Sequence, residues 1–197
     1  MTCNRVIVQT TRFLLFTVVV LGLSTASAEA TILTMVHQGT GFGSLNGVNF
    51  PSSAFSITSI ADTLNRESLT NGWSLSHTSS MISITGVATC QVVTPTRTYV
   101  NFGSASVGYS RFPSSGQDLF IGPSNAALGT WDMLSPIGPF VGDGHLIQWA
   151  DPQVVTSCGV LVMGGDSIAT FTATPEPTTL AMLGFGMAGI LLCRKSS

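Results

Sequence analysis

Apolar and hydroxyl side chains alternate along several short runs of this chain, and this period of two is the feature that most constrains the fold. The clearest run covers residues 82–87, and similar runs cover residues 55–60, 98–102 and 167–172. Because successive residues of a strand point to opposite faces, each run predicts a half-buried strand with Ser and Thr on its wet face. Shorter apolar runs predict three more strands, at residues 32–36, 146–149 and 160–163.

Turn-forming residues separate these runs at short intervals, for example at residues 71–72, 113–116 and 142–144. Many short strands joined by frequent turns are typical of a β-sandwich. We therefore expect an all-β fold, a single β-sandwich or jelly-roll-like domain. One short helix or turn is expected at residues 60–69, and residues 110–144 are expected to be rich in loops, because Pro and Gly disfavour long strands there.

The composition excludes two classes of protein. Only 8% of the residues are charged and 44% are hydrophobic, whereas disordered chains combine low hydrophobicity with high net charge. Seven Lys and Arg in 197 residues also exclude a strongly basic nucleic-acid-binding protein, which needs many cations to neutralise phosphates.

The N-terminus has the three parts of a secretory signal peptide. Arg5 and Arg12 precede an uncharged run over residues 13–23, and the small residues Ala26-Ser27-Ala28 follow. This order predicts a signal peptide over residues 1–28, removed by signal peptidase so that Glu29 becomes the new N-terminus. The alternative, an uncleaved membrane anchor, is disfavoured because the run has 11 residues, whereas about 20 are needed to span a bilayer.

The C-terminus predicts a single transmembrane helix. Residues 178–193 carry no charge, and Arg194 and Lys195 follow directly. As a helix these 16 residues would extend about 24 Å, slightly short of a hydrocarbon core of about 30 Å. The basic end would lie in the cytoplasm, so the chain would have a type I orientation. The alternative is a buried C-terminal helix of the globular domain.

The segment before this run is Pro175-Glu176-Pro177, and the two prolines favour a stiff, extended backbone there. The tripeptide, the short apolar run and the basic end together resemble the PEP-CTERM protein-sorting signal. The resemblance covers about residues 174–195 and departs from the usual pattern at Thr178, where Ser is frequent, and in a basic cluster of only two residues.

The resemblance implies a Gram-negative bacterium that makes exopolysaccharide, and a tail recognised by the membrane enzyme exosortase. The chain would pass through an inner-membrane intermediate to the cell surface or the extracellular matrix. The expected organisation is therefore a signal peptide (1–28), an ectodomain (29–174) and a sorting tail (175–197).

The ectodomain is acidic. Between Glu29 and Pro177 there are three arginines, no lysine and nine acidic residues, which gives a net charge of −6. Acidic polymers are therefore not attracted by bulk charge. Neutral glycans and divalent cations remain as candidate partners, and exopolysaccharide is the candidate that the resemblance suggests.

Two cysteines lie in the expected ectodomain, Cys90 and Cys158, which are 68 positions apart in the sequence. Cys3 belongs to the predicted signal peptide and Cys193 to the predicted helix. An exported chain meets an oxidising compartment, so a Cys90–Cys158 disulfide is expected. In the chain-entropy description, a disulfide that closes a loop of this size stabilises the folded state by on the order of 4 kcal/mol.

Motifs that carry chemistry are scarce. The three histidines, His37, His77 and His145, belong to no H-E-x-x-H pattern, and the chain has neither G-x-S-x-G nor a P-loop. Many serines make a Ser-His-Asp site possible on paper, but such a site is defined by geometry. We expect no enzyme activity and no cofactor.

The best polar cluster is Gly142-Asp143-Gly144-His145, with Asp132 upstream and Asp151 downstream. Carboxylates on a glycine-rich loop can bind calcium, but the spacing matches no known calcium loop. A tight turn is the preferred interpretation, and no metal site is predicted.

The three tryptophans, Trp73, Trp131 and Trp149, would stack on sugar rings if exposed, although burial in the core is the more usual place for Trp.

The sequence thus favours a non-catalytic surface or matrix protein with a structural or adhesive role. The alternatives are a permanently anchored type I membrane protein and a secreted hydrolase that acts on polysaccharide.

Overall fold

The computed structural model describes residues 32–113 and 117–176. The predicted signal peptide with Ala26, Ala28 and Glu29 lies outside these residues, as do Pro177, the predicted helix 178–193 and the basic end with Arg194 and Lys195. In the part of the chain that is described, the helices are short 3-10 turns, none of which has the length and apolarity to cross a bilayer.

Strands make up most of the described chain, which confirms the all-β class. In chain order the elements are β1 (Ile32–Leu45), β2 (Val48–Asp62), η1 (Thr63–Asn65), β3 (Arg66–Leu69), β4 (Gly72–Ser76), β5 (Ser79–Ile84), β6 (Ala88–Gln91), β7 (Thr96–Asn101), β8 (Ser106–Arg111), β9 (Asp118–Ser124), η2 (Ala126–Gly129), β10 (Ile137–Leu146), β11 (Val154–Thr156) and β12 (Gly159–Pro175).

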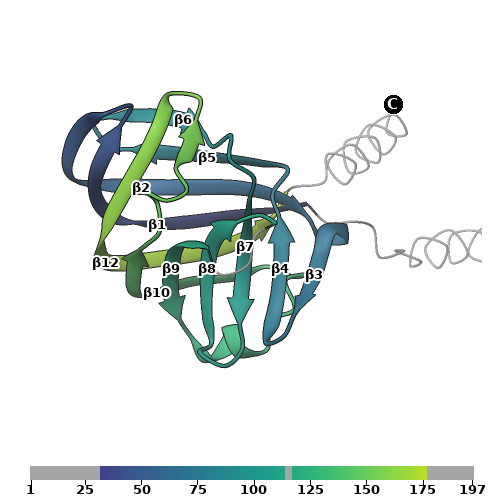
Figure 1. The fold of residues 1–197 in the computed structure, drawn as a ribbon. Coiled ribbons are helices and arrows are strands. Elements are labelled where there is room, and N and C mark those ends of the chain that lie inside the picture. The colour runs from purple at the N-terminus through teal and green to yellow at the C-terminus, as the bar shows by residue number, and fades with distance from the viewer. Residues whose placement is uncertain (1–31, 114–116, 177–197) are drawn as a thin grey trace, which may run out of the picture. The chain divides into compact units, whose positions relative to one another are not determined.

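The strands form one sheet instead of the two separate sheets of a sandwich. The order is β3-β4-β7-β8-β9-β10-β12-β1-β2-β5-β6, with β11 paired to β12, and the sheet curls so that its two halves face each other (Figure 1). The difference arises because β1, β2 and β12 are 14, 15 and 17 residues long. Each of them continues from one half into the other, and irregularities in the β1–β2 and β1–β12 registers accompany the bend.

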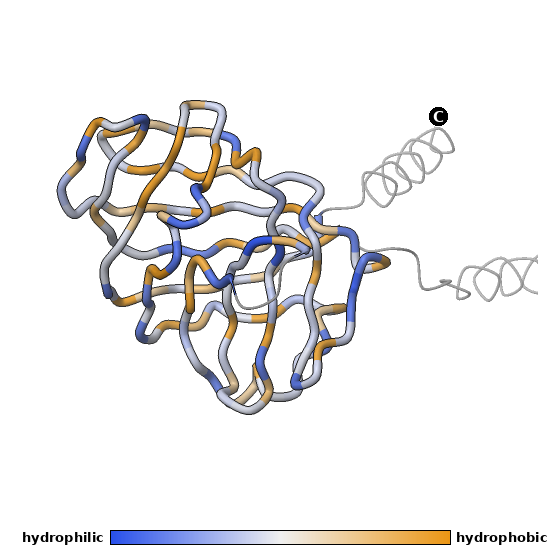
Figure 2. The backbone as a smooth tube through the Cα atoms, viewed as in Figure 1, coloured by the Kyte–Doolittle hydropathy of each residue, from blue (hydrophilic) through white to orange (hydrophobic). Residues whose placement is uncertain are grey.

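Two hydrophobic clusters fill the space inside the curl. The first holds Phe55, Phe120 and Trp149, and the second holds Met35, Val107 and Phe171. The alternation along the strands in Figure 2 follows from this arrangement, because every second residue faces a cluster. The long strands contribute to both clusters, so the two halves fold as one body.

The seam of the curl is closed by β11 and by a disulfide. β11 pairs with β12 on one side, while Val92 forms a bridge with Thr156 on the other. Cys90 at the end of β6 is bonded to Cys158, with 5.7 Å between their Cα atoms, which confirms the expected pair. The disulfide therefore fastens the last strand of the sheet path to the turn before β12.

Some local expectations need correction. The strand expected at 82–87 ends at Ile84, and β10 ends at Leu146, so residues 147–149 lie outside the strands. The short helix or turn expected at 60–69 is present as the 3-10 turn η1, begun by Asp62, whose side chain accepts a hydrogen bond from the Leu64 N–H. The region 110–144, expected to be rich in loops and without long strands, holds all of β9 and most of the ten-residue strand β10.

Candidate functional site

The start of the tail is part of the sheet. β12 runs to Pro175, which pairs with Leu33 of β1, and the Glu176 N–H donates a hydrogen bond of 2.9 Å to the Ile32 carbonyl. The strand thus extends one residue past the expected ectodomain boundary at Thr174. Because β1 and β12 are antiparallel, the two ends of the described chain lie side by side, and the sorting tail leaves the domain next to its N-terminal strand.

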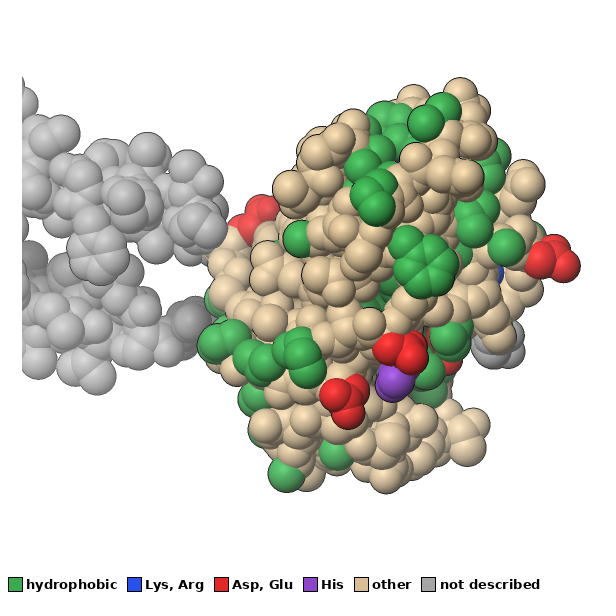
Figure 3. All heavy atoms as spheres, turned by 90° about the vertical axis from the view of Figure 1, so that its left-hand side faces the viewer, with side chains coloured by type: hydrophobic (Ala, Val, Ile, Leu, Met, Phe, Trp, Pro, Cys, Tyr) green, Lys and Arg blue, Asp and Glu red, His purple; other side chains and the backbone are tan. Residues whose placement is uncertain are grey.

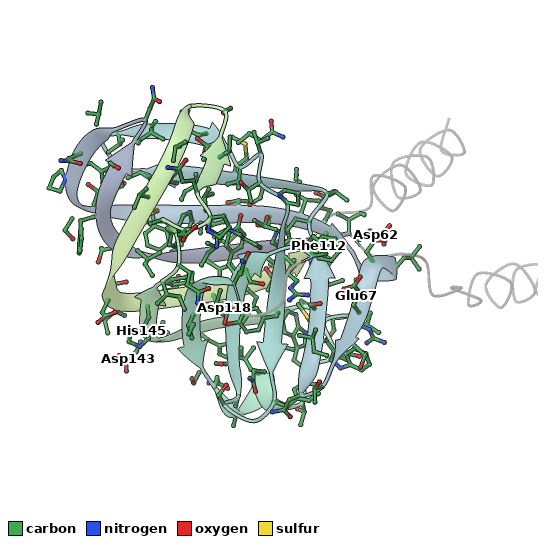
Figure 4. All side chains as sticks on the ribbon, in the orientation of Figure 1. Asp62, Glu67, Phe112, Asp118, Asp143 and His145 are labelled. Atoms are coloured by element: carbon green, nitrogen blue, oxygen red, sulfur yellow. A yellow bond between two sulfur atoms is a disulfide. The ribbon has the colours of Figure 1, made fainter. Side chains whose placement is uncertain are left out.

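A groove of about 590 Å³ lies over the outer face of β7, β8, β9 and β10. It forms where β9 and β10 share a short ladder of two residue pairs, His145 with Ile121 and Leu146 with Phe120. Figure 4 shows Asp143 and His145 close together, with Asp118 nearer the centre of the view. The lining residues are Tyr99, Asn101, Ser104, Ser106, Asp118, Ile121, Gly122, Ser124, Gly142, Asp143 and His145.

Tyr99 lies at the base of this groove, across β8. It pairs with Gly108, and a Cβ atom placed on Gly108 would come within 2.4 Å of the Tyr99 Cζ atom. The ring therefore occupies the space that a side chain on β8 would fill. The Tyr99 hydroxyl donates a hydrogen bond to the Asp118 carboxylate, and burial together with the Asp118 charge raises the pKa of Tyr99. Tyr99 consequently stays protonated, and its ring is held in place.

The Gly142–His145 segment is not the expected turn. These residues belong to β10, where Asp143 pairs with Ile168 and His145 with Asp166 of β12. His145 Nδ1 lies 2.8 Å from an Asp166 carboxylate oxygen, and both side chains are exposed. The tight turn was predicted wrongly because glycine weakens a strand signal, whereas the long partner strand β12 imposes the extended conformation.

The other members of the predicted cluster lie elsewhere. The Asp132 carboxylate accepts a hydrogen bond from the Leu134 N–H, and its carbonyl accepts one from Arg66. Asp151 acts electrostatically on Arg111. Across residues 32–113 and 117–176, no group of three His, Cys, Asp or Glu side chains could hold a metal ion.

A chain of polar side chains crosses the interior between the two halves of the sheet. His37 Nε2 lies 3.3 Å from the Thr98 hydroxyl, which also lies 3.0 Å from His77 Nε2. His77 Nδ1 in turn contacts the Thr96 hydroxyl at 2.9 Å, and the Tyr109 hydroxyl donates to Thr96 at 3.1 Å.

The chain of hydrogen bonds continues from the Tyr109 hydroxyl to the Ser80 hydroxyl and from there to the Ser59 hydroxyl, with 2.9 Å between the oxygens in each case. It therefore links β1, β2 and β5 with β7 and β8. The sequence did not predict it, because Ser59 lies in the alternating run 55–60, whose hydroxyl residues were expected on a wet face, and Ser80 lies in no predicted strand.

Burial determines the protonation states of the histidines and the tyrosine in this chain of hydrogen bonds. His37 has no exposed surface, and desolvation lowers its pKa to about 3. Desolvation, and to a smaller extent His37, lowers the pKa of His77 to about 3. Burial raises the pKa of Tyr109 to about 12. Both histidines are therefore neutral at neutral pH, and His37 Nδ1 is buried without a hydrogen-bond partner among the described residues.

The tryptophans are structural. Trp131 and Trp149 are buried, with 4% and 1% of their surfaces exposed, which confirms the core interpretation for both. Trp73 is partly buried, and the Arg66 guanidinium lies 4.1 Å from the centre of its ring. The aromatic ring in the groove is instead Tyr99, whose place over Gly108 could be found only once the β7–β8 register was known.

Comparison with known proteins identifies one region of the chain. The family model of the PEP-CTERM protein-sorting motif matches residues 173–195, which confirms the resemblance at the C-terminal tail. No curated protein and no solved structure matches the chain.

Proposed function

We propose that this chain, whose C-terminus is a PEP-CTERM sorting motif, is an exported, non-catalytic protein displayed at the cell surface or in the extracellular matrix. Its role there is structural or adhesive, and exosortase processes its tail. The observation that carries the proposal is the match at residues 173–195, which begins within the last strand of an all-β domain and continues past it. The signal peptide, its removal before Glu29 and the transmembrane helix at 178–193 are parts of the same proposal.

The attachment of the tail supports a particular place for processing. The motif match begins at Ala173, and Ala173, Thr174 and Pro175 all pair with β1. Glu176 adds one more hydrogen bond to Ile32. A protease or transpeptidase needs an extended backbone that is free of other pairing partners, so in the folded protein we expect the cut on the C-terminal side of Glu176.

The non-catalytic part of the proposal is supported by the roles of the polar residues. His37 and His77 serve the interior hydrogen-bond chain, and Arg66 and Arg97 bond to protein groups, Asp132 and Ser110. The Cys90–Cys158 disulfide closes the seam of the sheet. These groups stabilise a fold suited to an exposed, oxidising location.

Mass spectrometry of the protein from fractionated cells, with and without exosortase, tests this function. We expect an N-terminus at Glu29 and, only when exosortase is present, a new C-terminus between Glu176 and Thr178. A C-terminus at Ser197 in both strains would make the tail a permanent type I anchor. Depolymerisation of a polysaccharide by the purified native protein, lost in His145→Ala, would overturn the non-catalytic assignment in favour of a hydrolase.

A further inference from the structure

We propose that the groove over β7–β10 binds a segment of a neutral polysaccharide, with Tyr99 as the stacking surface and Asp143 as a hydrogen-bond acceptor at the rim. The inference deepens the proposed function by naming the ligand class of an adhesive surface protein.

The floor of the groove suits a sugar ring. Tyr99 lies over Gly108, where no side chain competes for the space, and Ile121 of β9 pairs with Gly108 and therefore faces the same side. The hydrogen bond from Tyr99 to Asp118 holds the aromatic ring in one orientation. A rigid aromatic surface beside polar groups is the arrangement that accepts the apolar face of a pyranose.

The charge of the groove selects against anionic ligands. Asp143 lies exposed at its rim, and the His145–Asp166 pair stands beside it. On the face shown in Figure 3, a histidine lies among acidic side chains and almost no basic side chain reaches the surface. Carboxylates accept hydrogen bonds readily, so the ligand that fits supplies donors and carries no negative charge.

The arginines do not reverse this selection. Arg97 lies close enough to Tyr99 to act on its pKa, but it is only 7% exposed and donates from Nε to Ser110. On Tyr99 the charge of Arg97 therefore acts in the opposite direction to that of Asp118. Arg66 covers Trp73, and Arg111 is 4% exposed and donates to the Pro152 carbonyl.

The backbone of the groove disfavours a peptide as the ligand. A peptide would add as a strand where the ladder between β9 and β10 stops, after Ile121 and His145. Pro123 of β9 lies against Gly142 at this point, and β10 carries Pro139. Proline has no N–H to donate, and it protects strand edges against added strands. Hydroxyl groups, which can donate to carboxylates and carbonyls in many directions, are the better complement.

The volume of the groove also suits a ligand. A volume of about 590 Å³ lies inside the range of roughly 300–1,000 Å³ that is usual for ligand sites. The groove lies on the outer face of the sheet, so a long polymer can pass over it without threading through the protein.

Affinity electrophoresis and calorimetry of the mature native protein test the proposal, with hydroxyethylcellulose and dextran as neutral probes. Alginate serves as the anionic probe and oligolysine as the cationic peptide. We expect at least one neutral polysaccharide to bind, and Tyr99→Ala and Asp143→Asn each to weaken that binding by about tenfold, which corresponds to one lost contact of about 1.4 kcal/mol.

The controls separate lost contacts from lost folding. Glu67→Gln removes an exposed carboxylate on β3, away from the groove, and is expected to leave binding unchanged. Tyr99→Phe keeps the ring and removes the bond to Asp118, so it is expected to retain binding better than Tyr99→Ala. Asp143 is exposed, so its substitution preserves the fold even if Tyr99→Ala does not.

Three results would overturn the proposal: no binding of either neutral probe, binding that both groove variants leave unchanged, or Asp143-dependent binding of alginate or oligolysine alone. None of these results depends on where the tail is cut. Failure of the polysaccharide-binding proposal is therefore distinguishable from failure of the sorting proposal.

Discussion

At the scale of single residues, the most consequential arrangement is a polar chain inside an apolar interior. His37 is fully buried against Phe120 and Phe171, with ring centres 5.9 and 4.7 Å apart. Its hydrogen bond to Thr98 leaves Nδ1 without a partner among the described residues. Buried polar groups tie specific strands together, but each also makes stability depend on its protonation.

Stability is expected to fall in acid because of these histidines. The pKa of His37 is about 3 in the folded protein, whereas the unfolded chain takes up the proton near pH 6.5. The stability associated with neutral His37 is complete above pH 6.5 and is lost as the pH falls toward 3, by up to about 1.4 kcal/mol per pH unit.

Urea unfolding of the native protein between pH 7 and pH 4 measures this loss. His37→Gln is expected to flatten the dependence on pH, while His145→Gln, which changes an exposed histidine, is expected to leave it in place. An unfolding midpoint that does not move with pH in the native protein would contradict the assignment of neutral, buried histidines.

At the scale of elements, the seam between β6 and β11 decides whether the sheet stays curled. Three backbone hydrogen bonds cross it among the described residues, from the Ser157 N–H to the Gln91 carbonyl at 2.8 Å and from the Val93 and Thr94 N–H groups to the Val155 carbonyl. Two more use the Ser157 and Thr94 hydroxyls as acceptors. β11 has only three residues. A covalent bond at this position therefore compensates for a short ladder.

Removal of the disulfide is expected to cost roughly 2–4 kcal/mol, because the bond closes a loop of 68 positions in the unfolded chain. The double variant Cys90→Ala/Cys158→Ala should show this loss in chemical unfolding. Reductant should destabilise the native protein to a similar extent and leave the double variant unaffected. Equal stability with and without reductant would show that the seam holds without the bond.

At the scale of the whole molecule, the sheet connects the sorting tail to the N-terminal strand. Leu33 and Ile32 of β1 hold Pro175 and Glu176 through the last pair of the β1–β12 ladder and one further hydrogen bond. The folded domain thus presents the tail at a defined point. Unfolding of the domain would release more of the motif to the processing enzyme.

A spacer tests this coupling. Insertion of six Gly and Ser residues between Thr174 and Pro175 moves the whole Pro175-Glu176-Pro177 motif off the sheet. We expect exosortase-dependent processing to continue, with the cut moving together with the motif, so that the mature protein gains the mass of the spacer. A cut at an unchanged distance from the end of β12 would show that the sheet, and not the motif, positions the enzyme.

Local sequence patterns determined the parts of this protein that depend on near neighbours. Alternating runs predicted strands at 55–60, 98–102 and 167–172 because the side-chain period of a strand is local. The sorting tail is a contiguous segment, and its match at 173–195 needs no tertiary information. The Cys90–Cys158 disulfide was predictable because the expected ectodomain, residues 29–174, holds only two cysteines.

Only the tertiary structure decided the features that depend on register between distant strands. Whether β1 and β12 end within one half of the sheet or continue into the other depends on their pairing with each other over more than 100 positions, and this pairing gives one curled sheet in place of the expected sandwich. The register of the β7–β8 hairpin places Tyr99 over Gly108, and it could not be read from the alternation of side chains alone. The fold also buries His37 beside Thr98, 61 positions away, and no short-range pattern encodes such a contact.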